Sequence, residues 1–377
     1  MIRHERIAVL AHDRFPDDAR AAIGLIRYGR SEVVAVVDTA RRSPVTSQLV
    51  RSLPQIPIVR RFDDVDEPID ALYVGIDVGR DGDDADLSEP VRRDVRAALE
   101  AGCDVVVSQA GFPVDDPEFE GLTADGGGQI VDVGAPPPDR SRAAGRPRAA
   151  GRPRAAGRPR AADRPRAADR PKAADRTADA DAAVLLTIGT DRYVGTSATA
   201  FELADAARER GIDAALVPTS GVGVLLDGPG VSLDRVPTGR VYDVIDGLVR
   251  ERGERHDLLV VEGRGAICHP GSSGQTCGLL HGARPDGLVL CHSAGRDLMH
   301  GYDVDLPSTA AYVDLYERVA APVAETAVVA GALNTMNVAT PPAAREAVSD
   351  FADRLGAPAT DPVRFDADPI LDAVDVG

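Results

Sequence analysis

The chain has 377 residues, a formal net charge of −17, 44% hydrophobic residues and only 4% aromatic residues. This length predicts two domains, each able to bury a core of Val, Leu, Ile and Ala. The acid excess excludes nucleic-acid binding by the folded domains, because neutralising phosphates requires positive charge. A single lysine, Lys172, stands beside 42 arginines. Together with the acid excess, this predicts a halophilic protein that stays soluble in concentrated salt.

The N-terminal segment from Met1 to Arg6 is charged and runs straight into a short apolar stretch, unlike a secretory signal. No stretch approaches the roughly 18 apolar residues of a membrane-spanning helix. Four cysteines without a C-x-x-C pair favour free thiols in a reducing compartment. We therefore expect a cytoplasmic protein with no membrane segment.

Residues 1–137 alternate apolar runs with amphipathic stretches, which predicts a Rossmann-like α/β domain with a parallel sheet. Asp38 ends the second predicted strand, where an acidic residue can hold a ribose hydroxyl. The first turn, Ala11 to Phe15, lacks the G-x-G-x-x-G glycines, so the sequence does not favour NAD binding. Helices are predicted at 16–29 and 88–101, and strands at Ile7–Ala11, Val33–Asp38, Ile56–Val59, Ala71–Ile76, Asp104–Ser108 and Gln129–Val133.

Residues 138–180 have the composition of a linker. From Arg142 the sequence repeats every six residues, as Arg-Ala-Ala-Gly-Arg-Pro and then with Asp in place of Gly. A proline in each repeat prevents a continuous helix, and almost no apolar side chain is available for burial. We expect a disordered, positively charged spacer.

Residues 181–377 restart the alternation and predict a P-loop NTPase-like domain with a second parallel sheet, so that each domain has three layers. Helices are predicted at Ser197–Arg210 and at 238–252, 308–320 and 341–355. Strands are predicted at Val184–Ile188, Ala214–Pro218, Leu258–Glu262, Leu288–Cys291, Ala327–Leu333 and, as a short one, near Pro358–Val363.

A glycine-bracketed turn follows the first of these strands and leads into a helix. Such a turn aims backbone N–H groups and a helix N-terminus at an anion. The lysine expected after the second glycine is Thr196, so the cation that assists γ-phosphoryl transfer is missing. Phosphate binding is therefore better indicated than ATP hydrolysis. The predicted cofactor-binding residues are Gly189, Thr190, Asp191, Gly195, Thr196, Ser197 and, after a later strand, Asn334, which could contact an adenine edge.

Glu262 ends a predicted strand and is the candidate metal ligand. Segment 268–300 is rich in cysteine and histidine within Gly-rich sequence that we expect to be a loop. Its spacings match no closed zinc motif. The histidines fit acid–base or substrate-binding groups, and an arginine can clamp a carboxylate. The predicted catalytic residues are His269, His281, His292 and Arg296.

Taken together, these motifs resemble a family, long described as a domain of unknown function, that is associated with D-glutamate N-acetyltransferase. Its members join a Rossmann-like domain to a P-loop-like domain. The P-loop-like domain is also similar to dethiobiotin synthetase, which implies Glu262 on the metal side and Asn334 at the adenine. The resemblance rests on G-T-D at 189–191 with V-G at 194–195, V-E-G-R-G at 261–265, G-L-L-H-G at 278–282, L-V-L-C-H at 288–292 and T-D-P-V-R-F at 360–365.

Four positions depart from the family's pattern. Thr196 and Arg20 replace lysines, Gly221 replaces a glutamine, and a histidine of a later loop falls near Ala110. The resemblance implies an N-acetyltransferase that binds acetyl-CoA at the P-loop-like turn. Its substrate would be a small molecule, an acidic amino acid, and a homo-oligomer is compatible with it. Three alternatives stay open: an ATP- and Mg²⁺-dependent ligase or kinase, a non-catalytic nucleotide-binding paralogue, and an NAD-dependent epimerase or dehydratase.

Overall fold

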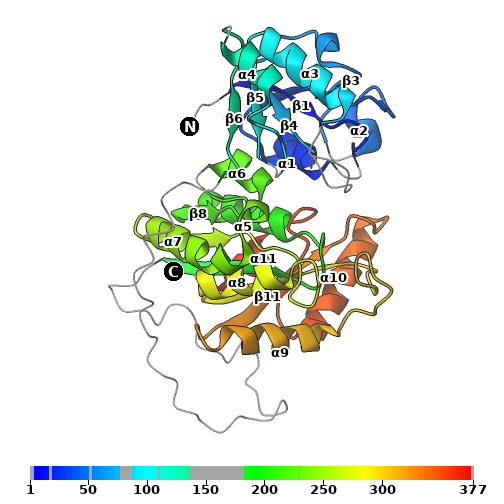
Figure 1. The fold of residues 1–377 in the computed structure, drawn as a ribbon. Helices are drawn as coiled ribbons and strands as arrows, with labels where there is room; N and C mark the ends of the chain where they lie inside the picture. The colour runs from blue at the N-terminus through cyan, green and yellow to red at the C-terminus, as the bar shows by residue number, and fades with distance from the viewer. Residues whose placement is uncertain are drawn as a thin grey trace. The chain divides into compact units, whose positions relative to one another are not determined.

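The computed structural model describes residues 4–16, 19–50, 53–76, 87–108, 111–124, 126–135, 182–228 and 230–374 (Figure 1). These form two compact units. One contains the described residues within 1–136 and 220–235, and the other contains those within 137–219 and 236–377. The hexapeptide repeat, predicted to be a disordered spacer, lies outside the described residues.

The first unit is built on six short strands: β1 (Arg6–Leu10), β2 (Glu32–Val37), β3 (Ile58–Val59), β4 (Ala71–Val74), β5 (Asp104–Val107) and β6 (Ile130–Asp132). They form one parallel sheet in the order β3-β2-β1-β4-β5-β6. Consecutive Val, Ile, Leu and Ala side chains of the central strands are buried, as expected when helices cover both faces. The strand order is that of dinucleotide-binding sheets, and the predicted Rossmann-like fold is confirmed.

The helices of this unit are α1 (Arg20–Tyr28), α2 (Thr46–Leu49), α3 (Glu89–Glu100), α4 (Pro117–Ala124) and α6 (Gly221–Asp227). In α3 the buried positions Val91, Val95, Ala98 and Leu99 repeat at helical spacing, with a proline in the first turn. Helix α6 comes from the second half of the sequence and packs on α1. A Cβ atom added at Gly24 would lie 2.8 Å from Val222 Cγ1, so glycine permits this approach.

The second unit also has six strands: β7 (Ala183–Gly189), β8 (Ala214–Val217), β9 (Leu258–Val261), β10 (Gly287–Ser293), β11 (Ala327–Asn334) and β12 (Ala359–Thr360). They form a parallel sheet in the order β12-β11-β10-β7-β9-β8. Strand β7 lies inside the sheet, so the turn that follows it is flanked by the ends of β10 and β9. The predicted P-loop-like fold is confirmed.

Six helices cover this sheet: α5 (Thr196–Glu209), α7 (Val241–Gly253), α8 (Ser273–Ala283), α9 (Thr309–Ala320), α10 (Pro341–Leu355) and α11 (Asp368–Val374). Right-handed crossovers put α7 to α10 on one face and α5 on the other. The packing agrees, because α7 contacts α8, α8 contacts α9 and α9 contacts α10, whereas α11 contacts α5 (Figure 1). Within the described residues, no helix has the length and apolar character needed to cross a bilayer.

The Gly-rich segment expected to be a loop contains a helix, α8. Its glycines at 274, 278 and 282 are four residues apart and lie on one face. Added Cβ atoms there would lie 2.8 Å from Thr238 Cγ2, 3.0 Å from Val241 Cβ and 2.7 Å from the Tyr242 carbonyl oxygen. The glycines therefore let α7 and the turn before it approach closely, and this contact offsets their low helix propensity.

Candidate functional site

The turn that joins β7 to α5 has the geometry of an anion-binding loop. Tyr193 has φ 65° and Gly195 has φ 104°, both in the left-handed region. Gly195 is the N-cap of α5 and supplies no side-chain hydrogen bond, so the N–H groups of the first turn have no side-chain cap and suit an anion. An added Cβ at Gly189 would lie 2.8 Å from the carbonyl oxygens of Asp191 and Gly265, so this position requires glycine.

Asp191 fixes the turn from inside. Its carboxylate is fully buried, and Oδ1 accepts a hydrogen bond from the Arg192 N–H at 2.7 Å. Oδ2 accepts from the His300 N–H at 2.7 Å and from the Arg296 guanidinium at 3.2 Å. The same guanidinium nitrogen, Nη1, donates to the Arg192 carbonyl at 3.4 Å. Arg296, predicted to bind a substrate carboxylate, thus already uses one guanidinium nitrogen to hold the turn.

Glu262 lies at the end of β9, beside the turn. It is fully buried, and Oε2 accepts from the Thr219 N–H at 2.8 Å. The adjacent Gly263 N–H donates at 2.8 Å to Thr187 Oγ1, which donates to the Thr196 carbonyl at 3.1 Å. In the described part of the chain, no group of three or more His, Cys, Asp or Glu is arranged to hold a metal ion. Glu262 as a metal ligand stays a prediction.

Tyr316, a residue that the sequence did not single out, holds the turn through its hydroxyl. It is fully buried on α9 and donates to the Gly189 carbonyl at 2.8 Å. It also accepts from the Ile267 N–H at 3.1 Å. A tyrosine on an amphipathic helix carries no sequence signal for such a role, because the contact depends on how α9 packs.

His292 lies at the end of β10 and is linked to the turn. Its Nδ1 is 2.8 Å from Thr190 Oγ1, and its ring stacks on Phe351 with centroids 5.7 Å apart. Burial, with a smaller contribution from the charge of Arg354, lowers the pKa of His292 to about 4. The imidazole is therefore neutral at pH 7.

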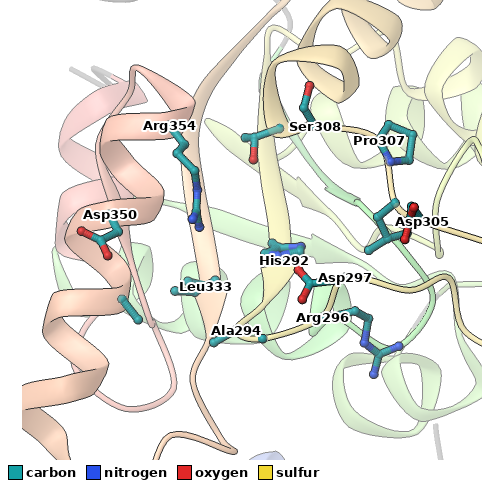
Figure 2. Close-up of a pocket in the computed structure, with 14 residues that line it drawn as sticks. His292, Ala294, Arg296, Asp297, Asp305, Pro307, Ser308, Leu333, Asp350 and Arg354 are labelled. Atoms are coloured by element: carbon teal, nitrogen blue, oxygen red, sulfur yellow. The ribbon is translucent and has the colours of Figure 1, made fainter.

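A cavity of about 600 Å³ opens above His292 (Figure 2). Its walls are the ends of β10 and β11, the segments 294–297 and 305–308, the start of α9 and one side of α10. The volume lies within the range of small-molecule sites. The ionisable residues that line it are His292, Arg296, Asp297, Asp305, Asp350 and Arg354.

The other two predicted catalytic histidines do not line this cavity. His269 Nδ1 accepts from the Gly271 N–H at 3.0 Å, and its Nε2 donates to the His300 carbonyl at 3.0 Å. His281 lies on α8, with Nε2 2.8 Å from the Val319 carbonyl oxygen of α9. Both rings therefore link separate backbone segments, and these contacts stabilise the fold around the site.

Asn334 lies beside the turn. A Cβ atom placed on Gly195 would be 3.6 Å from Asn334 Cβ and 3.7 Å from its Nδ2. Its Oδ1 accepts from the Met336 N–H at 3.0 Å, and its carbonyl accepts from the Ala294 N–H at 3.0 Å. The structure thus gathers the predicted cofactor-binding residues at one edge of the sheet.

The first turn of the Rossmann-like unit is held by hydrogen bonds to its own side chains and to those of the next strand end. Asp38 Oδ1 accepts from the Asp13 N–H at 2.7 Å, and His12 Nδ1 accepts from the Thr39 N–H at 3.0 Å. His12 Nε2 is 2.7 Å from the buried Asp94 carboxylate. These contacts tie the first turn to the end of β2 and to α3.

Gly221, which replaces a glutamine of the family's pattern, lies where a side chain would clash. An added Cβ there would lie 2.6 Å from Ser108 Oγ and 2.9 Å from the Ser108 carbonyl oxygen, so this backbone has no room for a glutamine. Arg20 is the first residue of α1. Ala110 lies outside the described residues.

Comparisons with known proteins agree with this architecture. The P-loop domain of unknown function DUF1611_C matches residues 169–371, and the Rossmann-like domain DUF1611_N matches residues 43–136. The chain also resembles the crystal structure of a DUF1611 family protein from Anabaena variabilis. That comparison has a TM-score of 0.81 and 29% identity, and it covers 98% of this chain and 99% of the other.

Two curated relatives carry the name D-glutamate N-acetyltransferase. The protein from a Pseudoalteromonas species is 33% identical over 193 residues, which covers 50% of this chain and 56% of the relative. The protein from Tritonibacter scottomollicae is 35% identical over 198 residues, which covers 50% and 57%. The match therefore spans little more than half the length of these relatives.

Proposed function

The chain belongs to the DUF1611 family, and we propose that it is an N-acetyltransferase that moves the acetyl group of acetyl-CoA to the amino group of an acidic amino acid. The relatives' name points to D-glutamate as this amino acid. The observation that carries the proposal is His292, a neutral base that lines the cavity and is hydrogen-bonded to Thr190 of the phosphate-binding turn.

The turn suits a coenzyme whose phosphates are bound and not cleaved. The uncapped start of α5 and the hydroxyls of Thr196 and Ser197 offer donors to phosphate oxygens. The missing lysine would matter most for γ-phosphoryl transfer, where it neutralises developing charge. Binding of the coenzyme phosphates needs no such step.

His292 would supply the proton transfer that N-acetylation requires. An amino acid reaches the site as an ammonium ion, which must lose a proton before its nitrogen can attack. That proton goes to solvent, because an imidazole whose pKa is about 4 is too weak a base to take it from an ammonium ion. The nitrogen then bonds to the thioester carbonyl carbon and becomes strongly acidic, so the neutral imidazole of His292 takes its second proton. The C–S bond breaks, and the coenzyme leaves as a thiolate that takes up this proton. Arg296 would orient a carboxylate of the substrate through guanidinium donors other than Nη1.

The alternatives predict different ligands. An ATP- and Mg²⁺-dependent enzyme would need Glu262 to reach a metal through Oε1, since Oε2 accepts from the Thr219 N–H. An NAD-dependent enzyme would need the first turn of the Rossmann-like unit to admit a pyrophosphate, and that turn lacks the G-x-G-x-x-G glycines. A non-catalytic paralogue would bind acetyl-CoA or ATP and turn over neither.

The test combines a turnover assay with ligand-induced thermal shifts. Purified protein is mixed with acetyl-CoA and D-glutamate, and the release of coenzyme thiol is recorded. We expect the rate of thiol release to fall at least about 100-fold in His292→Asn. The loss of a general base costs up to about 10⁴-fold in rate. Acetyl-CoA should still raise the melting temperature of this variant.

His256→Asn is the matched control, because His256 pairs with Asp213 away from the cavity. It should leave turnover unchanged. Thiol release that persists in His292→Asn would contradict the role of this base. A thermal shift with ATP or NAD but none with acetyl-CoA would overturn the proposed function.

A further inference from the structure

Arg354, in the last turn of α10, is the second arginine of the cavity and was not singled out by the sequence. Figure 2 shows its side chain directed from α10 toward the space above His292 and Leu333. Within the described part of the chain, Arg354 makes no hydrogen bond and no ion pair. Its charge reaches the site, since it contributes to the lowered pKa of His292.

The two arginines of the cavity, Arg296 and Arg354, differ in whether a carboxylate balances their charge. Arg296 is paired with the fully buried Asp191, so much of its charge is already balanced. Arg354 has no such partner, although Asp350 precedes it by one helical turn and also lines the cavity. Among the described residues that line the cavity, Arg354 is therefore the cation whose charge no ion pair balances.

The acidic residues of the lining make Arg354 important for the binding of a second carboxylate. Asp297, Asp305 and Asp350 give the cavity an acidic character that favours an ammonium group and repels a carboxylate. One substrate carboxylate can be met by Arg296, but a second one would face these aspartates uncompensated. A guanidinium binds a carboxylate through two parallel hydrogen bonds, which makes it the natural partner for that second group.

We infer that Arg354 is the specificity-determining residue of this cavity, and that it selects a dicarboxylic amino acid by binding the side-chain carboxylate. This inference rests on the proposed function for the identity of the site as the acceptor site. The recognition itself is a binding property and does not require turnover.

The experiment measures binding and turnover separately in the full-length protein. Calorimetric titration gives Kd for D-glutamate and for D-glutamine, which has the same length but one carboxylate. In Arg354→Gln we expect a 10- to 100-fold higher Kd for D-glutamate and less than a threefold change for D-glutamine. In the thiol-release assay, KM for D-glutamate should rise while kcat changes little. Arg354→Lys should recover part of the affinity, since it restores charge without the planar fork.

Arg345→Gln is the matched control, because Arg345 lies on the same helix but over the Phe365 ring, away from the cavity. It should change neither Kd, and the melting temperatures of all variants establish that the fold is intact. An unchanged Kd for D-glutamate in Arg354→Gln, or an equal loss for both ligands, overturns the inference. If the wild-type protein binds D-glutamate through Arg354 but releases no thiol, the proposed function fails while the role of Arg354 stands.

Discussion

His292 couples the stability of the protein to pH, because its pKa lies near 4 in the folded state and near 6.5 when exposed. The unfolded chain binds the proton more tightly, so stability is greatest above pH 6.5 and falls as the pH drops toward 4. Arg354 and Arg296 oppose protonation, whereas Asp297 and Asp191 favour it.

We predict that between pH 7 and pH 5 this histidine alone removes about 2 kcal/mol of unfolding free energy, since one pKa unit corresponds to about 1.4 kcal/mol. The free energy of unfolding is measured by denaturant titration at both pH values. His292→Asn should lose this part of the pH dependence and His256→Asn should keep it. Parallel pH profiles for the wild type and His292→Asn would show that His292 is solvated in the folded state.

Thr196 allows a direct test of phosphate binding at the turn. In Thr196→Lys, the new ammonium would be next to bound phosphates, and one charged hydrogen bond contributes roughly 1.5–3 kcal/mol. We therefore expect acetyl-CoA or ATP to bind about 10- to 100-fold more tightly, measured by calorimetry. Thr238→Lys, at an exposed position outside the turn, is the control. No gain for either ligand would show that phosphates do not occupy this turn.

At the residue scale, the sequence indicated the groups that follow strands and missed those on helices. His292 and Asn334 were predictable because parallel strands end at one edge of a sheet, so the residues there converge. Tyr316 and Arg354 were not predictable, because their roles depend on where α9 and α10 pack. His269 has the same strand-end signal as His292, yet both of its ring nitrogens bind backbone groups.

At the scale of elements, the contact between α7 and α8 depends on glycine. A Cβ at Gly282 would lie 2.7 Å from the Tyr242 carbonyl oxygen and 2.9 Å from Ile245 Cβ, and the backbone atom cannot move aside cheaply. We predict that Gly282→Ala destabilises the protein by about 1–3 kcal/mol, despite the higher helix propensity of alanine.

Gly247, in the interior of α7, provides the opposite case. Apart from its chain neighbours and the backbone of its own helix, no described atom lies within 4 Å of its added Cβ, so Gly247→Ala should stabilise the protein by about 0.5–1 kcal/mol. Denaturant titration of both variants measures the two signs. Stabilisation by both substitutions would mean that the two helices do not approach as closely as the structure shows.

The same contact explains why α8 was not predicted while the strands were. The central strands of both sheets are short runs of Val, Ile, Leu and Ala, and such runs are distinctive because they are buried on both faces. Helix α8 carries three glycines, which by propensity alone favour a loop. These glycines stabilise the protein only by letting α7 pack closely on α8. The local sequence cannot show this contact.

At the scale of the whole molecule, the chain does not divide simply at the repeat. Residues 220–235 follow β8 of the second sheet, yet they belong to the first unit. Helix α6 is short, with only seven residues, and its partner α1 is about 200 positions earlier in the chain. Hydrophobic periodicity cannot reveal a pairing over that distance, whereas the two sheets follow from local alternation.

A pair of substitutions tests this long-range contact. If α6 packs on α1, the added Cβ of Gly24→Ala meets Val222 Cγ1 at 2.8 Å, and the variant should lose about 1 kcal/mol of unfolding free energy. Val222→Ala removes the obstructing carbon. The double variant should then be more stable than the sum of the single effects by about 0.5–2 kcal/mol, measured as a double-mutant cycle in denaturant. If α6 did not contact α1, Gly24→Ala would instead stabilise α1 by up to about 1 kcal/mol through helix propensity, and the two substitutions would be additive.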